Sequence, residues 1–337
     1  MSKLLHITNG DGAADVLKNS VLDGDTLPWR DTMHYGPFPE GIDFDEISAV
    51  RARYFAGNSD EVFVEIERDF QLRNDHLKAT EHYDEVVLWF EHDLLDQLQI
   101  TQILDWFGSQ HVKPYSLTMI CINSFEGIEP FRGLGQLNCD QMVSLFSTRL
   151  PVTQLQMELA SEIWAAFRSP NPKELETCQE RNLDSLPFLG AALFRHLEEY
   201  PWTSDGLTRT ERQIMTLISS EVSRPGMVFS DNMQLETCLF IGDWPTYKHI
   251  SNLCNTSMIQ CEPNQEFQYE IDTKISIEEF RAQRLSITEI GNQVLSGAIN
   301  ATDLIERDEW LGGVHLQSNE SMWMWDSEKR KLTLIAL

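Results

Sequence analysis

Four side chains that can exchange protons or bind a metal ion occur within one short segment, at Glu91, His92, Asp93 and Asp96. If Glu91 is buried, its pKa is raised because burial disfavours the charged form. Such a carboxyl group suits general acid or base catalysis, with His92 as its acid–base partner. Alternatively, Glu91, His92 and Asp93 hold Mg²⁺ or Mn²⁺ through oxygen and imidazole ligands. A structural interpretation is also open, since Asp93 is a good helix N-cap and Asp96 is well placed for the helix dipole.

The surrounding sequence predicts the elements that position this segment. The run from Glu85 to Phe90 is almost entirely apolar, which is typical of a central parallel strand buried on both faces. A helix over 94–107 and a second apolar strand over 116–122 complete a βαβ unit, for which a right-handed crossover is expected. Open α/β sheets bind ligands outside the carboxyl ends of their strands, and the four side chains fall at such an end.

A second group of polar side chains follows a predicted first strand over residues 3–8. Asn9 and Asp11 lie there in a glycine-containing turn, at the position of the phosphate loop in doubly wound folds. The spacing matches neither the dinucleotide-binding fingerprint nor a P-loop, so the phosphate signal is weak. A tight turn explains the same residues, because asparagine, glycine and aspartate favour turns.

A third group follows a predicted second strand over 24–29, which Pro28 either ends or places at an edge of the sheet. This group consists of Arg30, Asp31 and His34. Arg30 either forms an ion pair with Asp31 or binds an anion through both arms of its guanidinium group.

The three groups converge if their strands are parallel, because the carboxyl ends of parallel strands share one edge of a sheet. We therefore predict a single rim that carries all of these side chains. A rim of this composition favours a small anionic or nucleotide ligand, with help from a metal ion or from acid–base groups. Arg51 and Arg53, on a predicted helix, either add phosphate contacts or lie on a solvated face.

The composition limits the class of protein. The chain has 337 residues, of which 53 are acidic and 26 basic, and its formal net charge is −27. An acidic protein is poorly suited to nucleic acid, whose binding depends on phosphate neutralisation by lysine and arginine. No apolar run of about 18 residues predicts a membrane span. The scattered cysteines form no metal-binding pair, and residues 1–10 do not resemble a secretion signal, so we expect a cytoplasmic protein.

The pattern of predicted elements changes along the chain. Residues 1–150 alternate strands and helices, which predicts an α/β ligand-binding domain with a Rossmann-like parallel sheet. Residues 151–202 predict a helical linker region, and residues 203–337 predict a winged-helix-like α+β domain. Winged helices often read DNA, but residues 203–260 contain four basic and six acidic side chains. We therefore expect this domain to contact a protein partner, to support self-association or to pack within the chain.

Several stretches also resemble one bacterial family. They are 5–11, 29–31 with His34, 36–37 and 89–93, followed by 151–153, 207–213 and 310–316. On these stretches the chain resembles the domain-of-unknown-function family numbered eighteen thirty-five and, in its second half, the companion C-terminal region of those proteins. The resemblance covers nearly the whole chain. It implies a bacterial cytoplasmic protein and supplies no activity, cofactor or catalytic residue.

Two kinds of function stay open from the sequence. In the first, the N-terminal domain binds a small anionic or nucleotide ligand and, if it is catalytic, acts as a metal-assisted hydrolase or phosphoryl transferase. Glu91 or Asp93 is then the base or metal ligand, and Arg30 is the anion clamp. In the second, the protein is a non-enzymatic regulator or adaptor whose C-terminal region meets a protein or DNA partner. The sequence identifies neither the ligand nor the metal.

Overall fold

The structure is a computed structural model that describes residues 3–110, 114–238, 241–263, 266–269, 275–318 and 321–336. Contacts between residues divide the chain into two compact units. The first contains Met1–Leu193 and Trp310–His315, and the second contains Phe194–Glu309 and Leu316–Leu337. The domain boundaries expected near residues 150 and 202 stay predictions.

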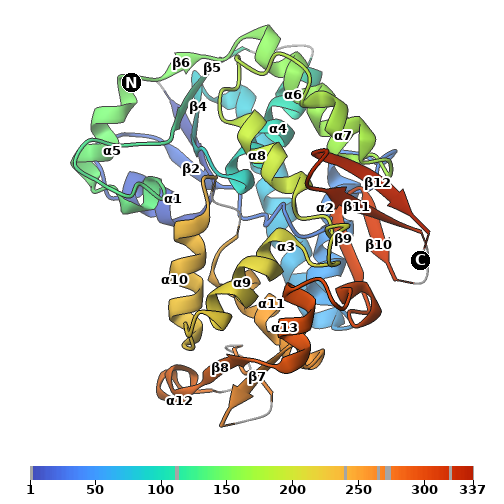
Figure 1. Ribbon diagram of the computed structural model, residues 1–337. Helices are drawn as coiled ribbons and strands as arrows, with labels where there is room; N and C mark the ends of the chain where they lie inside the picture. The colour runs from blue at the N-terminus through green and yellow to red at the C-terminus, as the bar shows by residue number, and fades with distance from the viewer. Residues whose placement is uncertain are drawn as a thin grey trace. The chain divides into compact units, whose positions relative to one another are not determined.

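The first unit is built on a five-stranded mixed sheet in the order β2-β1-β4-β5-β6, which confirms the α/β class (Figure 1). The strands β1, β2, β4 and β5 are parallel, and β6 is antiparallel to β5. β2 is the outermost strand, as Pro28 predicts. The strands are β1 (Leu4–Thr8), β2 (Asp25–Pro28), β4 (Glu85–Glu91), β5 (Ser116–Ile122) and β6 (Leu150–Pro151).

The order of the strands creates a switch point between β1 and β4. From β1 the chain moves outward to β2, and after β4 it moves in the opposite direction to β5. In the register of the sheet Thr8 lies opposite Trp89, so both strands end at the same edge. Open α/β sheets bind ligands in the crevice at such a reversal, outside the carboxyl ends of the strands. The fold therefore places Asn9 and Glu91 together at the expected ligand position.

Helices cover both faces of this sheet. Val87 and Trp89 pack in one core with Ala13 of α1 and Met142 of α5, which lie together in Figure 1. The intervening residues of β4 are also fully buried, as a central parallel strand requires. The helices of this part of the chain are α1 (Asp11–Lys18), α2 (Phe44–Ala56), α3 (Asp60–Lys78), α4 (Leu94–Ser109), α5 (Cys139–Phe146), α6 (Gln154–Arg168), α7 (Lys173–Cys178) and α8 (Leu189–Leu197).

Helix α4 is buried over most of its length because it packs against both α6 and strand β4 of the sheet. The Asp93 side chain caps it and accepts a hydrogen bond from the Asp96 N–H at 2.8 Å, which confirms the predicted N-cap. Its buried side chains include polar ones, among them Gln97, Gln99 and Gln102. Buried polar groups need hydrogen-bond partners. The chain segments around α4 therefore have to supply partners for these side chains.

Short elements complete this part of the chain. Gly36 and Pro37 form β3 and pair in parallel with Leu311 and Gly312 of β9. The remaining short elements are η1 (Ala79–His82), η2 (Leu134–Gln136), β9 (Asp308–Gly312) and β10 (Val314–Gln317).

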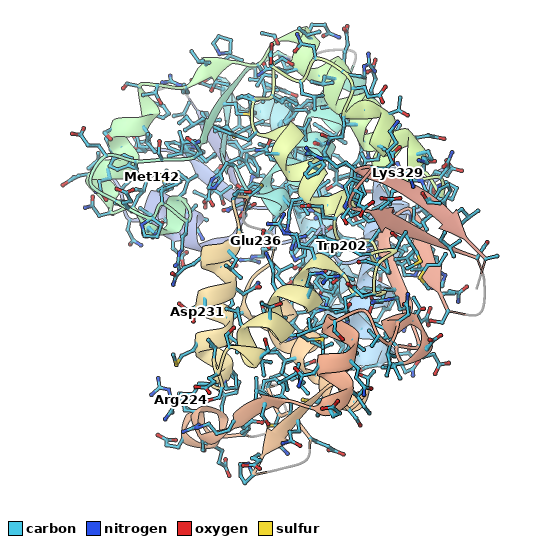
Figure 2. The ribbon with its side chains drawn as sticks, viewed as in Figure 1. Met142, Trp202, Arg224, Asp231, Glu236 and Lys329 are labelled. Atoms are coloured by element: carbon cyan, nitrogen blue, oxygen red, sulfur yellow. The ribbon has the colours of Figure 1, made fainter. Side chains whose placement is uncertain are left out.

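The second unit packs helices and an antiparallel pair of strands around one core. A capping box of Thr208 and Glu211 starts α9, and Arg224 and Glu236 mark the two ends of α10 (Figure 2). β11 and β12 form an antiparallel pair, and the Thr288 side chain caps α13. The elements are α9 (Arg209–Ser219), α10 (Pro225–Leu235), α11 (Asp243–Asn255), β7 (Ile259–Glu262), α12 (Ile277–Ala282), β8 (Arg284–Ile287), α13 (Glu289–Leu295), η4 (Ala301–Asp303), β11 (Met322–Asp326) and β12 (Lys331–Ile335).

None of the helices in the described ranges combines the length and the apolar character needed to cross a lipid bilayer.

Candidate functional site

Three carboxyl groups meet where β4 passes into α4. Glu91, Asp93 and Asp96 each offer an oxygen atom, and these atoms lie within 4.8 Å of one another. Glu91 is 4% exposed and Asp96 is 0% exposed, so water does little to screen their charges. We call these three residues the carboxyl cluster. Three ionised carboxylates at this spacing repel one another strongly unless protons or a cation neutralise them.

Local hydrogen bonds hold the carboxyl cluster in place. The Glu91 N–H donates to Asp96 Oδ1 at 2.7 Å, so the strand end and the first turn of α4 are tied together. Gln97 Nε2 donates to the Glu91 carbonyl at 2.6 Å. Residues of α4 itself therefore fix the strand-to-helix junction. Asp96 accepts the Glu91 N–H there, in addition to its favourable position for the helix dipole.

Asn9 joins the carboxyl cluster from the end of β1. Its Nδ2 atom donates to Asp96 Oδ2 at 3.0 Å and to Glu91 Oε1 at 3.3 Å. Gln99 of α4 donates to the Asn9 carbonyl at 3.3 Å and to the Asp31 carbonyl at 3.0 Å. The ends of β1, β2 and β4 are thus connected through polar groups, as parallel strands with a common edge predict.

A loop after β5 covers Glu91, and no pattern in the sequence predicts this contact. The Leu134 N–H donates to Glu91 Oε1. A Cβ atom at Gly133 would overlap the Glu91 carboxylate, so the close approach of this loop requires glycine. The loop lies more than forty residues beyond Glu91 and has no periodic pattern, which explains why sequence reasoning missed it.

Gly133→Ala is expected to lower the free energy of unfolding by about 1–3 kcal/mol, because the new methyl group overlaps Glu91 and the backbone has a positive φ of 155°. Urea denaturation measures this change. Gly135→Ala is the matched control in the same loop, since a Cβ there meets nothing closer than 3.8 Å. Equal losses in the two variants would contradict the packing of Gly133 against Glu91.

Burial changes the protonation of all three groups. Burial and the neighbouring charge of Asp93 raise the pKa of Glu91 to about 8. Burial, with the charges of Asp93 and Glu91, holds the pKa of Asp96 well above its usual range, and burial also raises the pKa of Asp93. At neutral pH the carboxyl cluster therefore retains protons unless a cation replaces them. The site can exchange protons or bind a cation, and either property is typical of functional carboxyl groups.

His92 is not among the side chains that make up the carboxyl cluster. Adjacent residues at a strand end face opposite sides, and the His92 ring lies 6.2 Å from the Phe188 ring in an edge-on arrangement. The metal ligands predicted from the sequence are Glu91, His92 and Asp93. Among the described residues, the side chains whose metal-binding atoms lie together are Glu91, Asp93 and Asp96. The charge of His92 acts on Asp93, so His92 stays close to the site without joining this ligand set.

Arg30 and Asp11 form an ion pair with each other. Arg30 Nε and Nη2 both donate to the Asp11 carboxylate, at 2.9 Å and 2.7 Å for the shortest contacts. The side chains are 52% and 54% exposed, so the pair is solvated. The predicted alternative of an Arg30–Asp31 pair is wrong. Arg30 does use both arms of its guanidinium group on an oxyanion, which here is a carboxylate of the protein.

Asp31 and His34 lie inside the unit. Arg51 Nε donates to Asp31 Oδ1 at 3.0 Å, and Arg73 lies 3.8 Å from the same carboxylate. The Arg51 side chain is fully buried, so neither a solvated face nor a phosphate contact describes it. Arg53, by contrast, is exposed and pairs with Asp60. Asp31 therefore balances buried arginines, and His34 is buried with its ring 5.2 Å from that of Tyr35.

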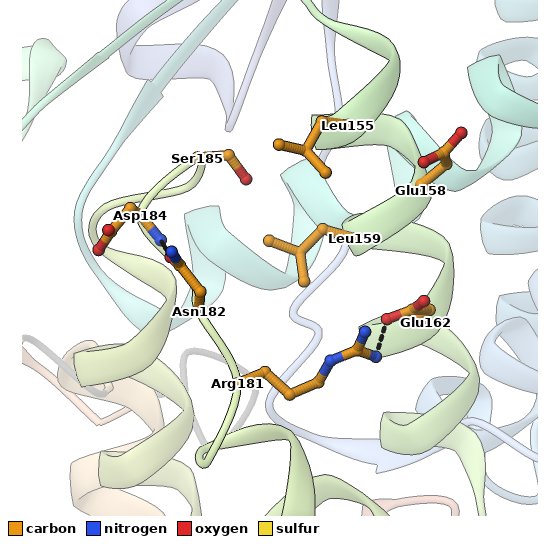
Figure 3. Close-up of a pocket in the computed structure, with 8 residues that line it drawn as sticks. All are labelled: Leu155, Glu158, Leu159, Glu162, Arg181, Asn182, Asp184 and Ser185. Atoms are coloured by element: carbon orange, nitrogen blue, oxygen red, sulfur yellow. Dashed lines mark hydrogen bonds and ion pairs between the residues drawn. The ribbon is translucent and has the colours of Figure 1, made fainter.

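A separate pocket of about 460 Å³ lies beside α6, away from the residues discussed above (Figure 3). Leu155 and Leu159 form its apolar wall, and an ion pair between Arg181 and Glu162 lies at one side. Its charged groups are thus partly neutralised by one another. The carboxyl cluster at the switch point remains the stronger candidate.

Comparison with known proteins adds no relative. No family model and no curated protein matches the chain, and the family resemblance described from the sequence stays a prediction.

Proposed function

We propose that the first unit binds a divalent cation at the carboxyl cluster and, through it, a small phosphate-bearing ligand. One observation carries this proposal: Glu91, Asp93 and Asp96 converge at the switch point of the sheet, between the carboxyl ends of β1 and β4. Carboxylate oxygens are the ligands that Mg²⁺ and Mn²⁺ prefer. A cation at this position would offset the repulsion among the three groups.

The neighbouring residues support an anionic ligand in addition to the cation. Mg²⁺ in proteins is commonly held by one or two carboxylates and completes its coordination with water and substrate phosphates. Arg30 already binds a carboxylate with both arms, and a phosphate group could replace Asp11 in that fork. A bound cation would also polarise a phosphoryl oxygen or activate water, which are the requirements of phosphoryl transfer or hydrolysis.

Titration of the full-length protein with Mn²⁺, followed by electron paramagnetic resonance, tests the proposal. One specific Mn²⁺ site is expected, and pyrophosphate should bind appreciably only when Mn²⁺ is present. Glu91→Gln and Asp96→Asn should each weaken Mn²⁺ by about tenfold or more, because each removes a charged ligand. Asp15→Asn, an exposed carboxylate on α1, should leave Mn²⁺ affinity unchanged. Unaltered Mn²⁺ binding in the Glu91 and Asp96 variants would overturn the proposal.

A second proposal concerns the other unit. The order α9, α10, α11 and the β7–β8 hairpin is that of a winged helix, and we propose that it contacts a protein and not DNA. Trp244 on α11 is 42% exposed, with the Lys248 ammonium group over its ring, and exposed tryptophan is enriched at protein interfaces. Duplex DNA at low salt is expected not to bind. Salt-dependent DNA binding that is lost in Lys248→Ala would contradict this interpretation.

A further inference from the structure

We propose that a pocket at the free edge of β2 holds the base of a nucleoside phosphate whose phosphate groups reach the carboxyl cluster. This inference rests on the proposed function, and it specifies the class of ligand. The pocket has a volume of about 500 Å³, within the range of small-molecule sites. Its lining comes from α1, β2, the segment after β2, α2 and α3, all within the first unit.

The main chain of β2 gives the pocket a donor and an acceptor. The Trp29 N–H donates to the Thr8 carbonyl at 2.9 Å, so Trp29 faces β1. Because backbone groups alternate in direction along a strand, the N–H and carbonyl of Thr26 face the outer edge of the sheet, where no strand in the described ranges pairs with β2. Thr26 lines the pocket. A paired donor and acceptor at one edge matches the polar edge of a nucleobase, which carries both kinds of group.

Apolar side chains form the walls beside this polar edge. Phe55 and Ile66 are half-buried, and Leu72 is 58% exposed although it is a large apolar residue. A single exposed apolar residue is common on a protein surface, but here one exposed and two half-buried apolar side chains line the same concave site, as in a ligand pocket. Apolar side chains of this kind suit contact with an aromatic ring.

The charge of the pocket fits an anionic ligand. Lys18, Arg30 and Arg73 line it against a single carboxylate, Asp69, in a chain whose net charge is −27. Arg73 is buried against Asp31, whereas Lys18 and Arg30 are about half exposed in their pairs with Asp15 and Asp11, so these two are the cations within reach of a ligand. An uncharged aromatic ligand would make no use of them.

Arg30 also connects the pocket to the carboxyl cluster. It lines the pocket and pairs with Asp11, which lies two residues after Asn9. Two residues span at most about 7 Å of chain, and Asn9 donates directly to Glu91 and Asp96. A base in the pocket would therefore place attached phosphate groups near Arg30 and the proposed cation.

Isothermal titration calorimetry of the full chain at saturating Mn²⁺ tests this inference. The probes are pyrophosphate and the four diphosphates ADP, GDP, CDP and UDP. At least one nucleoside diphosphate should bind about tenfold more tightly than pyrophosphate, a gain typical of a modest added contact. Leu72→Asp should reduce this advantage to within about twofold and leave pyrophosphate affinity unchanged. Val64→Asp is the matched control, because Val64 is on the same helix, is 61% exposed and does not line the pocket.

The outcomes separate this inference from the proposed function. If Mn²⁺ and pyrophosphate bind but no nucleoside diphosphate gains affinity, the pocket assignment is overturned and the cation site stands. If a nucleoside diphosphate binds without Mn²⁺ and Leu72→Asp weakens it, the pocket stands and the cation site fails. Equal weakening by Leu72→Asp and Val64→Asp overturns the pocket. Ile66→Ser is the second variant, in case Leu72→Asp does not fold.

Discussion

Glu91→Gln is expected to make the cation-free protein more stable at pH 8 and to leave its stability at pH 5 nearly unchanged. The folded state keeps the Glu91 proton up to a pKa of about 8, whereas the unfolded chain loses it near 4.5. The folded state therefore binds more protons in this window, and stability falls as pH rises, by up to about 1.4 kcal/mol per pH unit for one group. Glutamine does not titrate, so the variant escapes this loss and should gain about 2 kcal/mol or more at pH 8.

This substitution removes the titrating group and preserves the hydrogen bonds that the side chain accepts. Glu91 Oε1 accepts both hydrogen bonds, from Leu134 and Asn9, and a glutamine oxygen can accept the same two. Urea denaturation in the presence of a chelator, at pH 5 and pH 8, measures the effect. Addition of Mn²⁺ at about a hundred times its dissociation constant should stabilise the unaltered protein by about 2.7 kcal/mol and the variant much less. A variant that is less stable at both pH values would show that the Glu91 charge supports the fold.

Asp31→Asn is expected to lower the free energy of unfolding by about 3–5 kcal/mol. The substitution keeps the shape of the side chain but leaves the buried guanidinium of Arg51 without its carboxylate, and Arg73 loses the same partner. Chemical denaturation monitored by tryptophan fluorescence provides the measurement.

Asp11→Asn provides the comparison for this result. Asp11 also pairs with an arginine, but the Asp11–Arg30 pair is about half exposed, so its loss should change stability by no more than about 1 kcal/mol. Comparable losses in the two variants would contradict a structural role for Asp31 that is distinct from the solvated pair at the rim.

The sequence predicts the frame of the site because that frame depends on local patterns. The apolar run from Glu85 to Phe90 indicates a buried parallel strand, and Pro28 indicates that the second strand lies at an edge; the structure confirms both. The cap formed by Asp93 also follows from its position just before a helix. Such features depend on neighbours within a few residues, so they can be predicted from the sequence alone.

The partners of the polar groups could not be predicted, because they come from distant parts of the chain. The sequence leaves a solvated helix face open for Arg51, yet its carboxylate partner is Asp31, twenty residues earlier. Asp96 looks like a residue placed for the helix dipole until Asn9 and Glu91 are seen beside it. These pairings depend on how β1, β2 and β4 align, which no short pattern determines.

Anomalous diffraction from crystals soaked in Mn²⁺ tests the central claim most directly. We predict a manganese peak between the carboxylates of Glu91 and Asp96, with oxygen atoms at about 2.0–2.6 Å from the ion and Asp93 on the same side. A map that shows no manganese there at saturating concentration, with Asn9 still donating to Glu91 and Asp96, would contradict the claim. The carboxyl cluster would then be a proton-sharing structural joint between β4 and α4.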